Sequence, residues 1–290
     1  MSHALADALE KLLASGTAAA TQFTPAQRRQ LDVFARHTGA LRLITQGRGA
    51  SYQLTDAQLA QIHLQALRPL AKLALDPDLP SRANNIARTR NSKGRSHAHG
   101  TSYLLLKAIG PGVTWHRGDG AQLDISGNTN IAGASAIAIV PTDGWTTLEP
   151  IWLVENQALF DRLDWLPAGA HGSLVYYGGQ LSNVLLDWMA QRERTRRIIF
   201  FPDYDGVGLL NYARLVEKSL APVEFWLMPG WLELLQKYGN NGVWQKTQKE
   251  FNFALERLEK VGMPPELGAL CHALSSHGLA LEHESVWLAA

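Results

Sequence analysis

The chain has a single cysteine among its 290 residues, and it has no long uninterrupted run of apolar residues. One thiol, that of Cys271, forms neither an internal disulfide nor a thiolate metal cluster, which fits a reducing compartment, and we expect it to be a small core residue. No window reaches about 18 consecutive apolar residues, so we expect no membrane span. The first 13 residues lack a basic head and a cleavage site of small residues. We therefore expect no export signal and a cytoplasmic protein.

Charged residues are also few, at 18% of the chain, while hydrophobic residues make up 46%. A chain of this length and composition can bury a large core, which excludes wholesale disorder, a collagen-like repeat and a disulfide-stapled miniprotein. The net charge of +1 taken alone argues against nucleic acid as a partner. This total hides a division along the sequence. Residues 1–100 carry 13 basic and 6 acidic side chains, a net charge of +7, and the remaining 190 residues carry −6.

The basic excess peaks between residues 82 and 95. This segment contains no acidic residue and five basic ones, Arg82, Arg88, Arg90, Lys93 and Arg95. Such a run suits the phosphate backbone of a nucleic acid, and a solvated loop with surface cations is the alternative. The histidines that follow, His97 and His99, lack a third metal ligand nearby, so we interpret them as polar surface.

Residues 1–76 are predicted to form helices around a β-hairpin. Residues 4–13 have the apolar spacing of an amphipathic helix, and the segment 24–39 has the capping residues of a second one. Two short β-type runs over residues 41–54 enclose a glycine-containing turn with Arg48 at its tip, and a further capped helix follows. A helix, a hairpin with a basic tip and a helix resemble a winged helix that grips duplex DNA, although other small α+β units share this order.

Residues 77–145 are basic and then glycine-rich, and we expect them to form loops and short strands that connect two domains. Residues 146–290 alternate between buried strands and helices. The strand-type runs are residues 151–154, 173–177, 197–201 and 223–227. Helices of about 10–15 residues between them imply right-handed crossovers and a parallel sheet. We therefore predict an α/β protein, in which a C-terminal parallel-sheet domain follows an α+β, winged-helix-like DNA-binding region.

Three acidic residues fall at the ends of these strands, where parallel sheets bind ligands. Glu155 follows the first strand, and Asp203 and Asp205 follow the third. Carboxylates without histidine or cysteine suit Mg²⁺ or Mn²⁺, ions that serve phosphoryl chemistry. We expect Gly206 and Gly208 to allow close backbone approach, and the amides that open the next helix to hold a phosphate or orient the carboxylates. The alternative is that Asp203 and Asp205 are only a turn residue and a helix N-cap.

These motifs resemble a known family. Val154-Glu155-Asn156, then Gly178-Gly179 before a helix, then Phe201-Pro-Asp203-Tyr-Asp205-Gly-Val-Gly208 look like a Toprim domain, with its strand-end Glu and later Asp-x-Asp. Within Toprim proteins, the chain looks most like the DNA-cleaving subunit of topoisomerase VI and like JetD (also called MksG), the nuclease subunit of the SMC-like Wadjet plasmid-defence system. The resemblance covers about residues 148–230. In addition, Leu281-Glu282-His283-Glu284 is similar to an acidic Leu-Glu-Gln-Glu ending of JetD-type chains.

The resemblance implies a metal-dependent endonuclease that cuts double-stranded plasmid DNA in anti-plasmid defence. It implies Glu155, Asp203 and Asp205 as catalytic and metal-binding residues with Mg²⁺ or Mn²⁺ as cofactor, and it implies a homodimer that acts with SMC-like complex subunits. The Arg-Asp-x-Tyr-Tyr type motif with which topoisomerase VI enzymes attack DNA is missing. Tyr52, an alternating strand residue, is expected to pack instead. We therefore favour hydrolysis by metal-activated water over a covalent phosphotyrosine.

Two other functions stay open. A hydrophobic strand followed by Asp-x-Asp-Gly also resembles the nucleophile motif of haloacid-dehalogenase-type phosphatases, although that motif usually opens its domain and here 85 residues follow it. The other function is that of a non-catalytic protein, either DNA-binding or an SMC adaptor, with a degenerate Toprim fold.

An aromatic cluster is able to stack on bases, although its spacing favours packing. Its members are Phe225, Trp226, Trp231, Tyr238 and Trp244.

Overall fold

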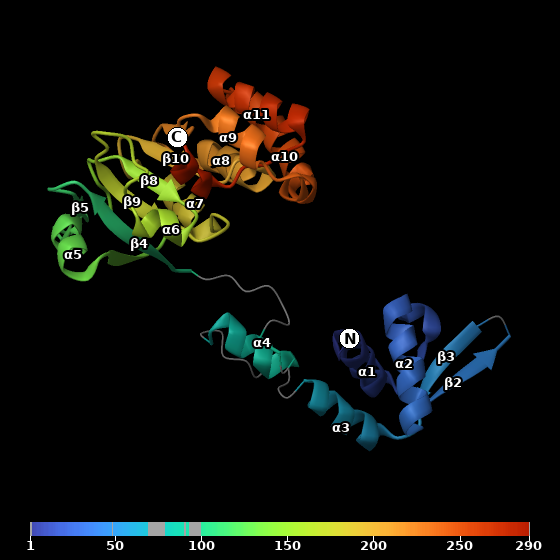
Figure 1. Cartoon of the computed structure of the whole chain (residues 1–290). Coiled ribbons are helices and arrows are strands. Elements are labelled where there is room, and N and C mark those ends of the chain that lie inside the picture. Colours follow the sequence, from blue (N-terminus) through green and yellow to red (C-terminus); the bar gives the residue numbers. More distant parts are fainter. Residues whose placement is uncertain (1, 48, 69–78, 90, 93–99, 290) are drawn as a thin grey trace. The chain divides into compact units, whose positions relative to one another are not determined.

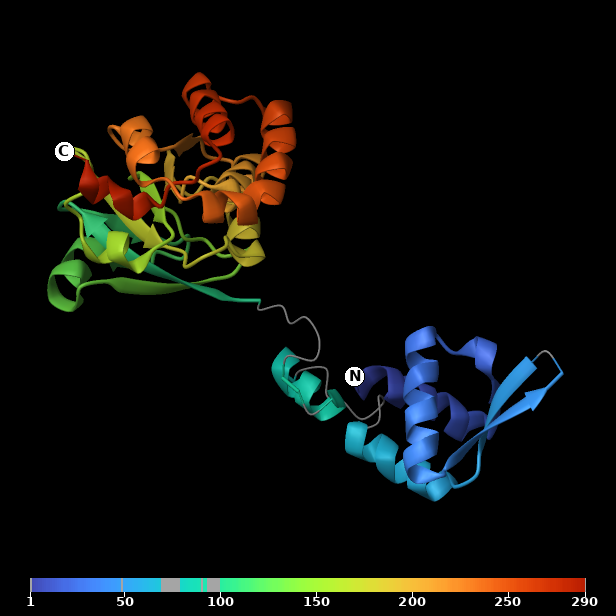
Figure 2. The same ribbon diagram turned by 45° about the vertical axis from the view of Figure 1, so that its right-hand side comes forward.

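The computed structural model describes residues 2–47, 49–68, 79–89, 91–92 and 100–289. The chain divides into two units, Met1–His99 and Gly100–Ala290. Figures 1 and 2 show the helices and strands of each unit from two directions.

The first unit contains a three-stranded antiparallel sheet with the strand order β1-β3-β2. Its elements are α1 (Ser2–Ser15), β1 (Thr17–Ala19), η1 (Ala20–Gln22), α2 (Pro25–Thr38), β2 (Leu41–Gln46), β3 (Gly49–Leu54), α3 (Ala57–Leu67) and α4 (Ser81–Thr89). Thr24 caps α2 in a reciprocal capping box with Gln27, and Gly39 ends the helix in the left-handed conformation. The predicted helices and hairpin of this region are confirmed. Leu9, Leu12 and Leu31 are fully buried in its core.

Tyr52 belongs to this core and is only 2% exposed. Its hydroxyl donates a hydrogen bond of 2.7 Å to Asp32 Oδ1, and its ring meets that of Phe23 edge to face at a centroid distance of 5.7 Å. Burial, followed by the hydrogen bond to Asp32, raises the pKa of the phenol. The packing role that the sequence predicts for Tyr52 is confirmed.

The second unit is built around a six-stranded sheet with the order β11-β10-β8-β9-β4-β7. Its elements are β4 (Ser102–Ile109), β5 (Thr114–His116), β6 (Gln122–Asp124), α5 (Ile125–Ala132), β7 (Ser135–Ile139), β8 (Ile151–Val154), α6 (Gln157–Asp161), β9 (Gly172–Tyr176), α7 (Asn183–Gln191), β10 (Ile198–Phe201), α8 (Gly206–Lys218), β11 (Val223–Phe225), α9 (Trp231–Tyr238), α10 (Asn241–Val261), α11 (Pro265–His277) and η3 (His283–Leu288). Strands β8, β9, β10 and β11 run parallel, as predicted. All residues of β8 and β10 are buried, as expected for strands that are covered on both faces.

The sheet extends beyond the domain boundary that the sequence analysis placed between residues 145 and 146. Strands β4 and β7 fall in the expected connecting region 77–145, yet they pair antiparallel with each other, and β4 pairs antiparallel with β9. The division between units lies at residues 99 and 100 instead. The glycines of this region include Gly110 and Gly112, whose positive φ angles serve the turn between β4 and β5. These glycines mark turns between short strands. The region was predicted to be a connection between domains because a glycine-rich linker has a similar composition.

The longest described helix is α10, with 21 residues. Its buried residues Trp244, Phe251, Ala254 and Leu258 recur at helical spacing, and Trp244 packs edge to face against Phe251. Packing is therefore the role of Trp244 in the aromatic cluster. In the part of the chain that the structure describes, no helix combines the length and the apolar character that a membrane span requires.

The start of α8 is pressed against α10, and glycine is required there. A Cβ atom added to Gly206 would lie 1.9 Å from the backbone oxygen of Thr247 and 2.6 Å from the backbone nitrogen of Phe251. We expect Gly206→Ala to destabilise the fold by about 1–3 kcal/mol, because α8 must move away from α10. This loss corresponds to a fall in Tm of about 2–12 °C, which thermal unfolding followed by circular dichroism would measure.

The matched control is Gly268→Ala in α11. The added Cβ would meet only the sulfur of Met263, at an ordinary contact distance of 3.7 Å. Alanine favours a helix interior by about 1 kcal/mol over glycine, so the Tm of this variant should stay the same or rise. Equal Tm values for the two variants would contradict the close packing of α8 on α10.

Candidate metal centre

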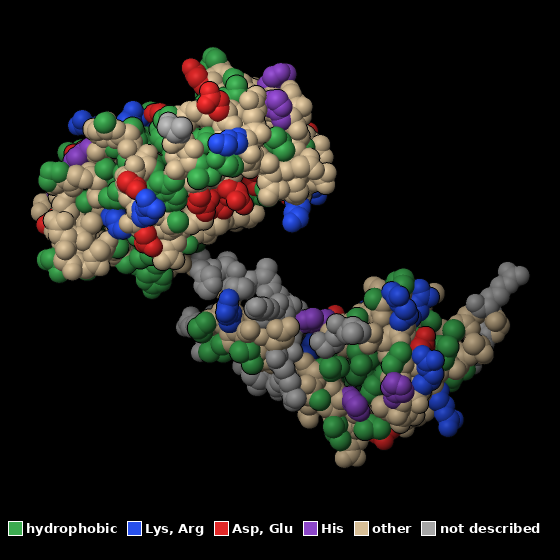
Figure 3. Space-filling model, in the orientation of Figure 1, with side chains coloured by type: hydrophobic (Ala, Val, Ile, Leu, Met, Phe, Trp, Pro, Cys, Tyr) green, Lys and Arg blue, Asp and Glu red, His purple; other side chains and the backbone are tan. Residues whose placement is uncertain are grey.

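Three segments that lie far apart in the sequence meet at the carboxyl ends of β8 and β10. These strands are parallel neighbours, with Val154 paired to Phe201, so Glu155 and Asp203 leave the same edge of the sheet as predicted. The third segment is residues 281–284. Tyr204 and Leu281 exchange two backbone hydrogen bonds, of 2.8 and 3.0 Å, which join this segment to the turn after β10. Acidic side chains gather on one face of this unit in Figure 3.

Asp203 is held by His283. Its Oδ1 accepts a hydrogen bond of 2.9 Å from the backbone N–H of His283 and lies 2.9 Å from Nδ1 of the same residue. Burial by itself would raise the pKa of this carboxyl group, but the close His283 ring with its charge and the backbone N–H of His283 outweigh burial and lower the pKa. Asp203 is therefore ionised, which is the state in which a carboxylate binds a cation.

Glu155 is partly buried beside Asp203. The hydroxyl of Tyr177 donates a hydrogen bond of 3.2 Å to Glu155 Oε2. Burial first, and then the negative charge of Asp203, raise the pKa of Glu155 to about 7. Burial and the charge of Glu155 in turn raise the pKa of Tyr177. The two acids that the sequence placed on separate strands are thus close enough to repel each other.

Asp205 is a helix N-cap and a member of the acidic cluster at the same time. It is 7% exposed, and its Oδ1 accepts a hydrogen bond of 2.8 Å from the backbone N–H of Gly208. Burial above all, with a further contribution from the charge of Asp203, raises its pKa to about 6. Asp205 is therefore the N-cap of α8, as the alternative interpretation of the sequence predicted. This role does not prevent its carboxylate from lying close to the other acids.

The amides of Gly206 and Gly208 at the start of α8 contact protein groups. The N–H of Gly206 donates to Thr247 Oγ1 at 3.2 Å, and the N–H of Gly208 donates to Asp205, so both amides are occupied by protein groups. The close approach that Gly208 allows is to the protein itself, because an added Cβ would lie 2.1 Å from the backbone oxygen of Asp203. Of the two predicted roles, the Gly208 amide has that of orienting a carboxylate, that of Asp205, whereas the Gly206 amide joins α8 to α10.

His283 and Glu284 complete the cluster, although sequence reasoning assigned no role to them. The side chain of His283 is 1% exposed, and its Nε2 lies 3.8 Å from Glu284 Oε2. The side-chain amide of Asn156, the residue after Glu155, donates to Glu284 Oε1. One ligand atom from each of Asp203, His283 and Glu284 lies within 4.8 Å of the others. The signal available in the sequence was the acidic ending Leu281-Glu282-His283-Glu284.

The charge of this cluster is what a divalent cation would neutralise. Three carboxylates, those of Glu155, Asp203 and Glu284, act on the imidazole of His283, and a fourth, that of Asp205, interacts with Glu155 and Asp203. Among the described residues, no lysine or arginine forms an ion pair with any of them. Carboxylate oxygens are the ligands that Mg²⁺ and Mn²⁺ prefer, so the chemistry of these groups suits either ion. Among the described residues, however, only Asp203, His283 and Glu284 form a group whose ligand atoms all lie within 4.8 Å of one another; Glu155 and Asp205 are not part of it. We call these four carboxylates and His283 the acidic cluster.

The predicted DNA-binding residues belong to the first unit. Arg82 is exposed on α4, and Arg88 lies on the same helix. Arg48, Arg90, Lys93 and Arg95, together with the side chain of Arg88, lie outside the described residues. The interface with DNA therefore stays a prediction.

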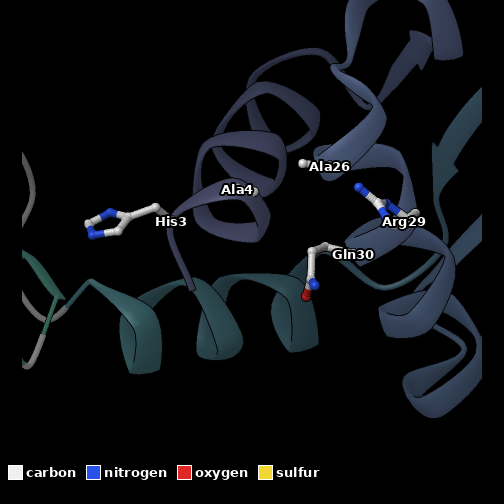
Figure 4. A pocket seen from close by; sticks show the side chains of 5 residues that line it. All are labelled: His3, Ala4, Ala26, Arg29 and Gln30. Carbon is white, nitrogen blue, oxygen red and sulfur yellow. The ribbon is translucent and has the colours of Figure 1, made fainter. Parts of the chain in front are cut away.

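A hollow in the first unit offers no comparable chemistry. Its lining residues are His3, Ala4, Ala26, Arg29 and Gln30. They come from α1 and α2, and His3 points away from Arg29 and Gln30 (Figure 4). Binding sites bring several polar groups together, and these side chains do not converge.

Comparison with known proteins assigns no family to the chain. No protein-family model matches it, and no curated protein matches it.

Proposed function

We propose that this chain is a Mg²⁺- or Mn²⁺-dependent DNA endonuclease of the Toprim type, similar to the JetD (MksG) nuclease of Wadjet systems and to the DNA-cleaving subunit of topoisomerase VI. The observation that supports this function best is the placement of Glu155 and Asp203 on adjacent parallel strands, with Asp205 two residues further on. This is the arrangement that the resemblance to Toprim domains implies.

In this proposal Glu155, Asp203 and Asp205 hold the cation. When bound, a divalent cation polarises a phosphodiester and stabilises the oxygen that leaves. The backbone N–H groups of His283 and Gly208 fix the orientation of Asp203 and Asp205, and the hydroxyl of Tyr177 does the same for Glu155. Preorganised carboxylates do not have to rotate into place during the reaction. The buried position of Tyr52 supports hydrolysis over attack by that tyrosine.

The two units then have different tasks. The first unit, with its β2–β3 hairpin between α2 and α3, would act as a winged-helix-like module, and the charge of +7 over residues 1–100 suits a DNA backbone. The second unit is acidic and would need its cation before a phosphate could approach. The resemblance to relatives that cut both strands as dimers implies a homodimer within an SMC-like complex, which would supply two acidic clusters.

The test is cleavage of supercoiled plasmid by the purified full-length chain, followed by gel electrophoresis. We expect nicked and linear products with Mg²⁺ or Mn²⁺ and none with a chelator. Cleavage that persists in the chelator would overturn the metal-dependent mechanism. Hydrolysis of a small phosphate ester without any DNA cutting would favour a phosphatase. DNA binding without cutting, with SMC-like partner proteins present, would favour an adaptor.

A further inference from the structure

We propose that Asp203, His283 and Glu284 form a second cation position that, through its histidine, prefers Mn²⁺ and other transition-metal ions to Mg²⁺. This inference rests on the proposed function, because Asp203 belongs to both sets of ligands. It adds two residues from the segment 281–284 to the strand-end acids for which the Toprim resemblance implies a metal-binding role.

The three side chains have the spacing of a metal site. One ligand atom from each lies within 4.8 Å of the other two. Nitrogen and oxygen ligands at about 2.0–2.2 Å from an ion lie about 3–4 Å from one another. Small side-chain movements would therefore bring the three atoms to coordinating distance. Imidazole nitrogen is a ligand for transition metals, whereas Mg²⁺ is held by oxygen, so His283 gives the site its preference.

His283 itself is the independent sign of a ligand. Its side chain is 1% exposed, and neither Nδ1 nor Nε2 has a hydrogen-bond partner of acceptable geometry among the described residues. Nδ1 is close to Asp203 Oδ1, at 2.9 Å, but its direction does not suit a ring N–H bond. Burying an unsatisfied polar group costs free energy. The two ring nitrogens of His283 face the carboxylates of Asp203 and Glu284. A cation bound between the ring and these carboxylates would give a ring nitrogen a partner.

The segment that carries His283 and Glu284 is fixed in place by both strand-end turns. Leu281 pairs with Tyr204 through the backbone, and the N–H of His283 bonds to Asp203. On the other side, the amide of Asn156 donates to Glu284. The orientation of this amide is set because its oxygen accepts a hydrogen bond of 2.8 Å from the N–H of Ala158 as the cap of α6. Glu284 is thus aimed by the turn that also carries Glu155.

The test counts bound Mn²⁺ in the full-length chain by the electron paramagnetic resonance signal of the free ion, with and without millimolar Mg²⁺. We expect two Mn²⁺ per chain, of which Mg²⁺ displaces one. Glu284→Gln and His283→Gln should each weaken binding of the Mg²⁺-resistant ion at least 10-fold. Glu282→Gln is the matched control, because Glu282 is exposed in the same segment, and it should keep both ions.

Asp205→Asn separates this inference from the proposed function. It should lose the Mg²⁺-displaceable ion and keep the resistant one. A wild-type count of one ion, or a count of two in both Glu284→Gln and His283→Gln, would overturn the second position. Neither outcome would contradict metal-dependent plasmid cleavage, because that function is tested separately. Two bound Mn²⁺ ions in the wild type, one of which is lost in Glu284→Gln, would support the second position even if no plasmid is cut. A folded Glu284→Gln variant, shown by an unchanged circular dichroism spectrum, makes the result interpretable if His283→Gln does not fold.

Discussion

Asp205→Asn is expected to slow metal-dependent plasmid cleavage by about three orders of magnitude and to leave the fold intact. Asparagine is as good a helix N-cap as aspartate, so its side-chain oxygen keeps the 2.8 Å hydrogen bond from Gly208. The variant therefore loses only a negative charge at the cation. Because burial above all raises the pKa of Asp205 to about 6, its charge at pH 8 costs folding free energy. The Tm in a chelator should equal or exceed that of the wild type.

Asp124→Asn is the matched control for this loss. Asp124 caps α5 in the same way, with its Oδ1 accepting a hydrogen bond of 2.8 Å from the N–H of Gly127, and it is not part of the acidic cluster. Its cleavage rate, measured by the disappearance of supercoiled plasmid, should match the wild type. Wild-type cleavage by Asp205→Asn in Mg²⁺ would mean that Asp205 is a helix cap alone, and the metal role would then be wrong.

The strand-end acids were predictable because local patterns and a general rule of parallel sheets both apply to them. Ile151–Val154 and Ile198–Phe201 are apolar throughout, which identifies buried strands without reference to anything distant. The carboxyl ends of parallel strands share one edge of the sheet, so Glu155 and Asp203 had to come near each other once those strands were neighbours. Burial at that edge, and then the charge of Asp203, raise the pKa of Glu155.

The contribution of His283 was beyond such reasoning, because no local pattern sets its position. It is brought to Asp203 by an isolated backbone pairing between Tyr204 and Leu281, after α8, β11 and three further helices have intervened. Likewise, β4 and β7 are short strands between glycine turns, and alternation alone does not reveal that β4 pairs with β9. In both cases the partner is chosen by tertiary packing, which periodicity does not encode.

Replacing Arg88, Arg90, Lys93 and Arg95 with glutamine is expected to weaken duplex-DNA binding by the full chain. Each cation that neutralises a phosphate adds about 0.9 to the slope of log affinity against log salt. Losing four such contacts would lower the affinity by up to about 10³-fold at 0.1 M salt and flatten the slope by about 3–4. Fluorescence anisotropy of a labelled duplex between about 50 and 200 mM salt measures both quantities.

A charge-matched variant decides whether the basic run or the net charge is responsible. Replacing four exposed cations of the second unit with glutamine removes the same four charges outside the run; these are Arg192, Arg196, Lys237 and Lys260. We expect this variant to keep the wild-type salt slope, because these cations lie in an acidic unit that repels the phosphate backbone until its cation is bound. Equal losses in the two variants would mean that DNA responds to overall charge alone. The split of +7 and −6 along the sequence would then have no bearing on where DNA binds.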